Sequence, residues 1–285
     1  MLDGPLSPMH YPDDRSDKPA PMSLLLRETT GRIRVLTVNR PEARNAFNEA
    51  LYDAATVALM EAAADPAIAV VVVTGSGEAF SAGADLTEMM QRNSGNFVNG
   101  THGFPGFVDQ LIDFPKPLLC AVNGLALGIG ATMLALVDLV FISAEARVRC
   151  PFTRLGVAPE AASSTTFVQL MGRQNATWAL LSSEWLSADE CVSMGLAFRV
   201  CQANELLAET MRHAQILASK PVNSLVESKR TIVAPLRAAL FEARERENEA
   251  FGVLLGGPAN IEALTAFAER REPDFSQIDD SPRRL

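Results

Sequence analysis

Residues 118 to 132 decide the fold class, and they read Leu118-Leu-Cys-Ala-Val-Asn-Gly-Leu-Ala-Leu-Gly128-Ile-Gly-Ala-Thr132. The first five residues are apolar, which predicts a strand that is covered on both faces of a sheet. Asn123-Gly124 ends that strand, and beyond Gly128 the apolar run from Ala131 to Val137 predicts a buried helix. A buried strand, a glycine-containing junction and a helix in succession are typical of α/β architecture.

The same alternation extends to both sides of this stretch. Three further strands are predicted, at residues 33–38, 68–73 and 140–143. The strand at 68–73 is an uninterrupted apolar run, so it should also be covered on both faces. A helix is predicted from its cap, Asn48, to about Ala64. The fold class expected from the pattern is therefore α/β.

The last third of the chain is dominated by helical patterns. Ser187 with Glu190 forms a capping box for a short helix, and Asn204 is expected to cap the next helix. Two more helices are expected, from Pro235 to about Leu255 and from Pro258 to Arg271.

These patterns divide the chain into four parts. Residues 1–22 are rich in proline and aspartate and predict a flexible N-terminal extension. Residues 23–200 form the expected α/β core, and residues 201–275 the expected helical C-terminal region. Residues 276–285 are expected to be a flexible tail.

The composition and charge of the chain narrow the classes of molecule that it is expected to bind. The chain has 25 Lys and Arg against 34 Asp and Glu, a net charge of −9, so it should repel phosphate backbones and bind no nucleic acid. The longest apolar tract, 118–142, is interrupted by polar residues, so no membrane span is expected. The four cysteines form no C-x-x-C pair and the three histidines have no ligand spacing. We therefore expect no metal, buried reduced thiols and a cytoplasmic protein.

Two glycine-containing junctions are the candidate site. The chain has no complete dinucleotide fingerprint, no P-loop and no G-x-S-x-G motif. The junctions, at residues 75–86 and 123–132, each follow a buried strand and lead to a helix start, where free N–H groups and the helix dipole favour negative charge. Two such junctions could converge on one oxyanion. The alternative is that the glycines only permit tight turns.

Three segments, in this order and spacing, resemble the crotonase (enoyl-CoA hydratase/isomerase) superfamily. They are Asn39-Arg-Pro-Glu-Ala-Arg-Asn-Ala-Phe47, Phe80-Ser-Ala-Gly-Ala-Asp-Leu86 and Ala121-Val-Asn-Gly-Leu-Ala-Leu-Gly128. The resemblance implies a crotonase spiral of ββα units followed by a helical trimerisation region. It also implies an acyl-CoA thioester as the ligand, with CoA as part of the substrate and no separate cofactor. The thioester oxygen would be held by the backbone N–H groups of Ala84 and Ile129.

The resemblance also bears on the reaction. Hydratases of this superfamily carry two glutamates at positions that hold Thr132 and Phe152 here, two residues that we assign to the acyl pocket. Adding water across a double bond needs a base and an acid, and neither residue can supply one. Hydration is therefore disfavoured.

Glu160 is the candidate catalytic base. The segment from Phe152 to Ser164 resembles the Δ3,Δ2-enoyl-CoA isomerases, in which one glutamate four residues after a glycine, here Gly156, takes and returns the proton. We expect Glu160 in an apolar pocket near Phe152 that raises its pKa. The alternative is a solvated loop carboxylate. Ala161 stands where those isomerases often have glycine, which leaves the local backbone conformation open.

The resemblance further suggests residues that contact CoA: Arg44, Ala82, Asp85, Leu86, Phe267 and Arg270. Phe267 and Arg270 would reach CoA from a neighbouring subunit of a homotrimer or a dimer of trimers. The alternatives are a surface arginine at position 44 and an ordinary packed phenylalanine and exposed arginine on the last helix.

Three other carboxylates receive different interpretations. Asp85 and Asp138 belong to family motifs but are interpreted mainly as structural groups. Glu88 could face the acyl pocket, although we interpret it as a helix-surface glutamate. The expected function is isomerisation of a 3-enoyl-CoA, with another crotonase reaction or a non-catalytic acyl-CoA-binding protein as alternatives.

Overall fold

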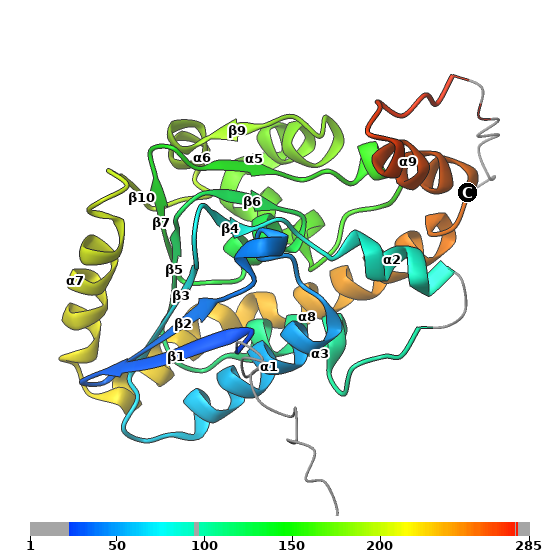
Figure 1. Ribbon diagram of the computed structural model, residues 1–285. Coiled ribbons are helices and arrows are strands. Elements are labelled where there is room, and N and C mark those ends of the chain that lie inside the picture. The colour runs from blue at the N-terminus through cyan, green and yellow to red at the C-terminus, as the bar shows by residue number, and fades with distance from the viewer. Residues whose placement is uncertain (1–22, 94–96, 277, 279–285) are drawn as a thin grey trace, which may run out of the picture.

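The computed structural model describes residues 23–93, 97–276 and 278 (Figure 1). The expected N-terminal extension, residues 1–22, lies outside the described residues, and so does most of the expected tail. The described chain contains two sheets with helices packed around them (Figure 1).

The larger sheet contains all four strands that the sequence predicts. Its strands, in spatial order, are β1 (Leu25–Thr30), β2 (Ile33–Val38), β3 (Val70–Gly75), β5 (Leu118–Val122), β7 (Leu139–Ser143) and β10 (Arg199–Cys201). β1 and β2 form an antiparallel hairpin, and every other neighbouring pair is parallel. The predicted strands are therefore neighbours in one mostly parallel sheet.

A smaller sheet alternates with the larger one along the chain. Its strands, in spatial order, are β4 (Ala79–Ser81), β6 (Leu125–Leu127), β8 (Arg147–Arg149) and β9 (Leu186–Ser187). After each of β3, β5 and β7 the chain passes to β4, β6 and β8 respectively, and then into a helix or a helical turn. This alternation is the expected spiral of ββα units.

Helices account for most of the remaining chain. They are α1 (Glu49–Ala64), α2 (Leu86–Asn93), α3 (Gly103–Asp113), α4 (Ile129–Thr132), α5 (Ser163–Leu181), α6 (Ala188–Met194), α7 (Leu206–Ala218), α8 (Val222–Leu254) and α9 (Pro258–Glu269), with 3-10 turns η1 (Pro41–Ala43), η2 (Met133–Ala135) and η3 (Thr153–Leu155). The Asn48 side chain accepts the Leu51 N–H at 2.9 Å, which confirms the predicted cap of α1. The capping box of Ser187 and Glu190 at α6 is also confirmed.

Two helix starts differ from the prediction. α7 has Glu205 at its N-cap and no side-chain capping bond, so Asn204 is not the cap. α8 begins at Val222, and Pro235 lies inside it. A proline within a helix removes one backbone hydrogen bond, but tertiary contacts hold α8 on both sides of it. Lys229 contacts Asp138 at 2.7 Å and Arg237 contacts Asp113 at 2.6 Å.

The helix predicted at 131–137 is also shorter and less regular than expected. α4 and the turn η2 together cover Ile129 to Ala135, and the chain then turns toward β7. Its apolar side chains are buried as predicted, with Ala131, Met133 and Leu134 at most 1% exposed.

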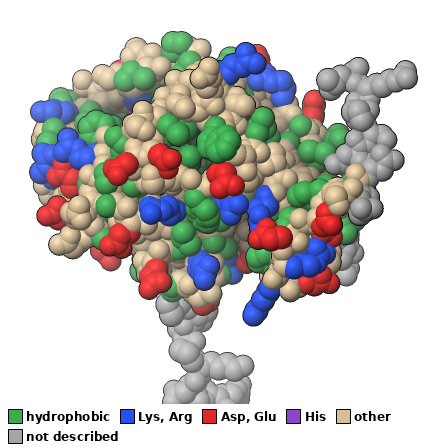
Figure 2. Space-filling view, turned by 90° about the horizontal axis from the view of Figure 1, so that it is seen from above, with side chains coloured by type: hydrophobic (Ala, Val, Ile, Leu, Met, Phe, Trp, Pro, Cys, Tyr) green, Lys and Arg blue, Asp and Glu red, His purple; other side chains and the backbone are tan. Residues whose placement is uncertain are grey.

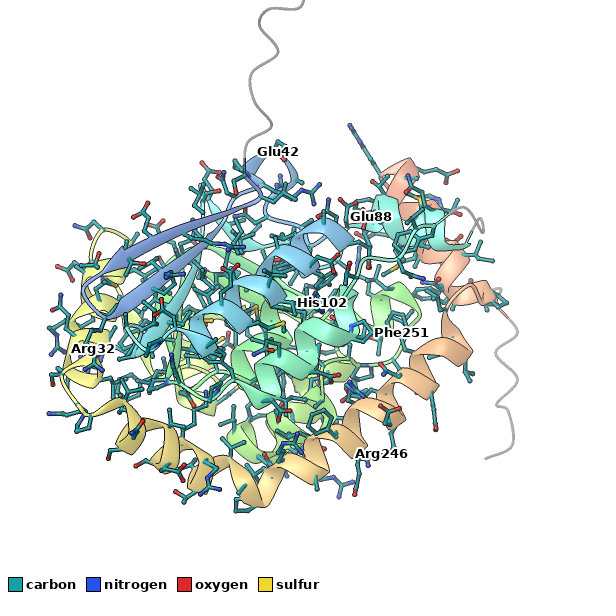
Figure 3. All side chains as sticks on the ribbon, turned by 90° about the horizontal axis from the view of Figure 1, so that it is seen from below. Arg32, Glu42, Glu88, His102, Arg246 and Phe251 are labelled. Atoms are coloured by element: carbon teal, nitrogen blue, oxygen red, sulfur yellow. The ribbon has the colours of Figure 1, made fainter. Side chains whose placement is uncertain are left out.

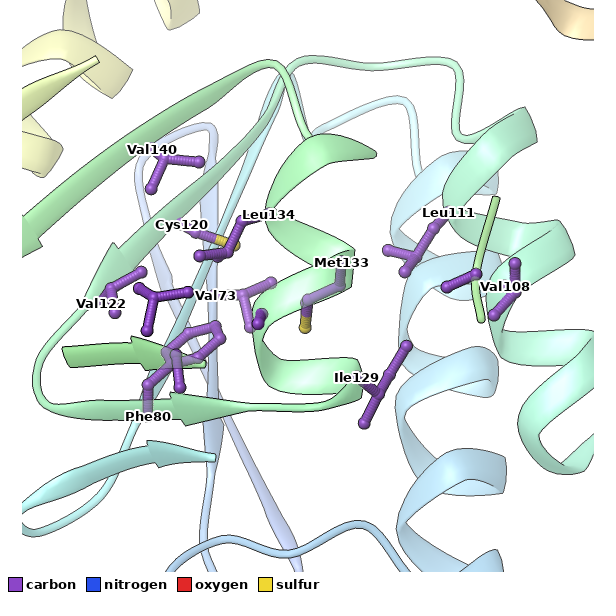
Figure 4. Packing of buried hydrophobic residues seen from close by; sticks show 14 of the residues in the cluster. Val73, Phe80, Val108, Leu111, Cys120, Val122, Ile129, Met133, Leu134 and Val140 are labelled. Atoms are coloured by element: carbon purple, nitrogen blue, oxygen red, sulfur yellow. The ribbon is translucent and has the colours of Figure 1, made fainter. Parts of the chain in front are cut away.

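The larger sheet separates two apolar cores. Val71 and Val73 of β3 belong to the core on the side of α1 and α3, whereas Val70 and Val72 belong to the core under α7. All four are nearly or fully buried, which confirms a strand covered on both faces. Figure 4 shows the first core around the helical segment that carries Ile129 and Met133. Burial of each such side chain contributes about 1.5 to 3 kcal/mol.

Two further features of the described chain are its lack of a single membrane-spanning helix and its mixed surface charge. No single helix among the described residues is long and apolar enough to cross a membrane. Taken together, α8 and α9, which are bent by 76° relative to each other, reach that length and apolar composition, and by those two criteria alone. Acidic and basic side chains are interspersed over the face seen from above (Figure 2).

Candidate active site

The two glycine-containing junctions lie side by side, because β4 and β6 are paired. Gly83 has a φ of +91°, and a Cβ atom there would lie 3.0 Å from the Leu127 carbonyl oxygen. Gly128 has a φ of +49°, and a Cβ atom there would lie 3.6 Å from the Gly83 Cα. Both positions have a positive φ that favours glycine, and at Gly83 the neighbouring backbone also leaves little room for a side chain.

Each junction presents a backbone N–H group at the start of a helix. Phe47 N–H donates to the Gly83 carbonyl at 2.7 Å and Asp85 N–H to the Phe47 carbonyl at 2.9 Å, a pattern that bypasses the Ala84 N–H. Ile129 is the first residue of α4. Within the described chain, neither the Ala84 N–H nor the Ile129 N–H donates to another protein group. Each of these two N–H groups is therefore available to an acceptor outside the described chain.

Glu160 lies beside the second junction. A Cβ atom on Gly128 would be 3.7 Å from Glu160 Oε1. The partly exposed side chain of Glu160 lines a cavity of about 310 Å³, whose wall also includes Ala84. The cavity thus brings together one candidate N–H donor and the candidate base.

The cavity wall is mostly apolar and comes from distant parts of the chain. Its larger apolar side chains are Phe47, Tyr52, Met89, Phe104, Phe251 and Leu255, from the loop before α1, from α1, α2 and α3, and from α8 and its end. Burial raises the pKa of Glu160 to about 8, and the nearby negative charge of Glu247 adds to this rise. An uncharged Glu160 near neutral pH is the expected consequence of so apolar a setting.

The backbone that follows Glu160 has an unusual conformation. Ala161 and Ala162 have φ values of +59° and +57°, in the left-handed region that glycine adopts more easily. Ala161 is therefore left-handed although it carries a Cβ atom, and this answers the question that the sequence left open.

The Asp53 carboxylate on α1 holds the loop that leads into α3, the helix that carries the cavity residue Phe104. Asp53 accepts the N–H groups of Thr101, His102 and Gly103 at 2.7 to 2.9 Å. The start of α3, and with it Phe104, is therefore held against α1.

The residues predicted to contact CoA fall into two groups. Arg44, Ala82, Asp85 and Leu86 lie together around the first junction, where Ala82 N–H donates to the Arg44 carbonyl at 2.9 Å. Arg44 is exposed. The Asp85 carboxylate contacts Arg40 at 3.2 Å and accepts the Thr87 N–H at 3.0 Å, as a structural and capping group would.

Phe267 and Arg270 form the second group, at the end of α9. Phe267 is 57% exposed and Arg270 is exposed. Neither lines the cavity of its own chain. The described chain does not bring them together with Glu160.

Thr132 and Phe152, which the sequence assigns to the acyl pocket, do not line the cavity that contains Glu160. They are 0% and 3% exposed and are absent from the cavity wall. The Thr132 hydroxyl donates to the Gly128 carbonyl at 3.2 Å, within its own helical turn, and Phe152 packs in the core. Their side chains are therefore engaged in local packing, and their assignment to the acyl pocket stays a prediction.

Glu88 also differs from its preferred interpretation as a helix-surface residue. It lines the cavity, and its Oε2 accepts the Glu49 N–H at 2.9 Å. Figure 3 labels Glu88 on α2 and Phe251 on α8, two wall residues from opposite ends of the sequence. Glu88 is the third residue of α2, and its hydrogen bond with Glu49 directs its side chain toward the N-terminus of α1.

The sequence analysis missed the contribution of α8 to this site. Asn248, Phe251, Gly252 and Leu255 line the cavity, and Glu247 lies near Glu160. The four wall residues are spaced by three or four positions, so they share one side of the helix, and this spacing can be recognised in the sequence. It was missed because the whole region was assigned to trimerisation.

The family model, the similar proteins and the similar solved structures all indicate the same family. The enoyl-CoA hydratase/isomerase family model matches residues 28–278. The 2,3-dehydroadipyl-CoA hydratase of Escherichia coli (strain K12) is 34% identical over 254 residues, which cover 89% of this chain and 99% of that protein. Enoyl-CoA delta isomerase 2 of Rattus norvegicus is 34% identical over 250 residues, 87% of this chain and 64% of that protein. The crystal structure of enoyl-CoA hydratase EchA8_6 from Mycobacterium marinum has a TM-score of 0.72 and 56% identity, and covers 75% of this chain and 100% of that chain.

Proposed function

Because this chain belongs to the enoyl-CoA hydratase/isomerase family, whose members act on acyl-CoA thioesters, we propose that it moves the C3–C4 double bond of an unsaturated fatty acyl-CoA to C2–C3. The observation that carries this proposal is the location of Glu160 in an apolar cavity beside Gly128. The two positions that hold glutamates in hydratases are occupied by Thr132 and Phe152, which are buried and carry no acid.

In the proposed mechanism, one carboxylate performs both proton transfers. The C2 proton lies between a thioester carbonyl and a double bond, so its loss gives a dienolate whose charge reaches the thioester oxygen. The N–H groups of Ala84 and Ile129 would bind that oxygen, and one such donor lowers the barrier by about 3 to 4 kcal/mol. Glu160 would take the C2 proton and return it to C4. Its raised pKa brings the two proton transfers closer to balance.

A second candidate is hydration of a 2-enoyl-CoA, as in several relatives named hydratases. The specific observation in its favour is that Glu88 lines the same cavity as Glu160. Two carboxylates on one cavity could serve as the acid and the base that hydration needs.

A substrate panel separates these candidates. We expect the protein to convert 3-enoyl-CoA to 2-enoyl-CoA faster than it hydrates 2-enoyl-CoA, measured by absorbance of the conjugated thioester and by chromatography of the products. Faster hydration would favour the second candidate. Binding of acyl-CoA without turnover of either thioester would instead indicate a binding protein.

The pH dependence of isomerisation is a specific prediction. Glu160 must be ionised to remove the C2 proton, and its pKa is raised to about 8. We therefore expect kcat/KM to rise with pH and to level off above about pH 8, because a base with a raised pKa is protonated and inactive below it. A pH–rate profile with 3-enoyl-CoA measures this. A profile that is flat from pH 6 to pH 9 would contradict the assignment of Glu160.

The proposed CoA contacts can be tested by replacing two arginines. If Arg44 and Arg270 bind phosphate groups, alanine at either position should raise KM about 5- to 50-fold and weaken its salt dependence, while kcat at saturation stays nearly constant. Arg230→Ala is the matched control, since its guanidinium is exposed and paired with Glu227. An unchanged KM in both variants would return these arginines to the role of surface charges.

Assembly as a trimer or a dimer of trimers in the cytoplasm is also part of the proposal. It rests on the family resemblance more than on the apolar residues of α8. Leu240 of α8 is buried within its own chain, and Leu236, Phe241 and Phe251 pack against the same core. The α8 side chains Ile232 and Leu254, by contrast, are 73% and 41% exposed.

A further inference from the structure

We propose that Glu247 of α8 is a positioning residue for Glu160: its buried carboxylate holds the backbone turn that carries the base. The structural part of this inference is independent of the reaction, and its kinetic part rests on the proposed isomerase function.

Glu247 connects the C-terminal region to the turn after Glu160. Its carboxylate accepts the Ala162 N–H at 2.6 Å and the Ser164 N–H at 2.7 Å, one on each oxygen. These partners are 85 and 83 residues away in the sequence. Glu247 is only 5% exposed, so water does not compete strongly for these charge-assisted bonds.

The turn needs this support because its own sequence does not favour its conformation. Ala161 and Ala162 are consecutive left-handed residues that both carry a Cβ atom. Such backbone persists only where the surrounding structure holds it in place.

The same bonds cap α5, which lacks a cap of its own. Ala162 occupies the N-cap position and has no side chain that can accept a hydrogen bond. The buried Ser163 hydroxyl has no hydrogen-bond partner in the described structure. Glu247 therefore supplies from α8 both the acceptor and the negative charge that a helix N-terminus favours.

Glu247 also acts on Glu160 through its charge. Its negative charge adds to the effect of burial in raising the pKa of Glu160. Burial raises the pKa of Glu247 as well, and its bonds from Ser164 and Ala162 oppose that rise. The negative charge of Glu247 thus favours the protonated form of Glu160. The other titratable groups near the pair or on the cavity wall include Cys150, Arg246, Glu49, Tyr52, Asp85 and Glu88.

Two substitutions separate the geometric role from the electrostatic one. Glu247→Gln removes the charge and keeps an oxygen for only one of the two N–H groups. Glu247→Asp keeps the charge and both oxygens, but its side chain is one methylene shorter, which withdraws the carboxylate from the two N–H groups. Glu249→Gln is the matched control, because it makes the same charge change at an exposed position on the same helix.

The measurements include two that do not depend on activity. Amide hydrogen exchange of Ala162 and Ser164 reports on the turn, and an infrared titration assigned with Glu160→Gln reports on the base. We expect exchange at least about 10-fold faster in both Glu247 variants. The titration midpoint of Glu160 should move to lower pH in Glu247→Gln and stay within a few tenths of a pH unit of the wild-type value in Glu247→Asp.

The kinetic measurement is isomerisation of 3-enoyl-CoA. Its kcat should fall about 10- to 100-fold in both variants with little change in KM. Glu249→Gln should match the wild type throughout.

The possible outcomes are distinguishable. Wild-type exchange at Ala162 and Ser164 together with an unmoved Glu160 midpoint in Glu247→Gln would overturn the inference. A loss of kcat without either physical change would overturn it too, because the defect would then lie elsewhere. If both physical changes occur in a protein that does not isomerise 3-enoyl-CoA, the inference stands and the proposed function fails. Should Glu247→Gln not fold, the exchange rates of Glu247→Asp decide.

Discussion

Replacement of Glu160 by Gln should lower kcat for isomerisation by a factor of about 10² to 10⁴, the contribution of a positioned general base, while binding of acyl-CoA survives. The amide resembles the protonated carboxyl that burial favours at this site, so the fold and the cavity should persist. Single-turnover kinetics with 3-enoyl-CoA measure the chemical step, and calorimetry with a saturated acyl-CoA measures binding.

Glu88→Gln is the matched control for this substitution, since Glu88 is a second carboxylate on the same cavity. We expect it to change kcat much less, because Glu160 is assigned both proton transfers. Near-complete isomerase activity in Glu160→Gln, with a large loss in Glu88→Gln, would transfer the role of the base to Glu88.

Replacement of Gly128 by Ala should lower kcat by a factor of about 10² to 10³, the usual cost of losing one preorganised oxyanion donor. Gly128 has a φ of +49° and a ψ of −121°, a conformation that residues with a Cβ atom avoid. Its new methyl group would lie 3.6 Å from the Gly83 Cα and 3.7 Å from Glu160 Oε1. The backbone would have to move, and the Ile129 N–H would move with it.

Gly31→Ala is the matched control, because it introduces backbone strain of the same kind away from the candidate active site. Gly31 has a φ of +58°, and a Cβ atom there would meet nothing within 4 Å. Thermal unfolding should show a modest loss of stability in both variants, whereas only Gly128→Ala should lose activity. If Gly128→Ala kept its kcat, the Ile129 N–H would not be an oxyanion donor.

Much of the fold could be predicted because local patterns decide it. The four predicted strands all occur, and Ile68–Val73 packs on both faces because an uninterrupted apolar run has no polar face to turn toward water. The predicted start of α8 was wrong because proline usually ends a helix. Packing of Leu236 and Leu240 against the core, together with the contacts of Lys229 and Arg237, holds the helix on both sides of Pro235.

By itself, the sequence determined the α/β class, the two glycine-containing junctions and the carboxylate that follows Gly156. These features depend on residues close together in the chain, whose periodicity and backbone freedom can be recognised without the fold. Only the tertiary structure decided that Thr132 and Phe152 face the core, that Glu88 lines the cavity, and that α8 forms part of its wall. It alone also placed Glu247 on the turn after Glu160, across 85 residues of chain. Such contacts depend on how elements pack, and no local pattern of residues specifies which distant carboxylate fills a buried space.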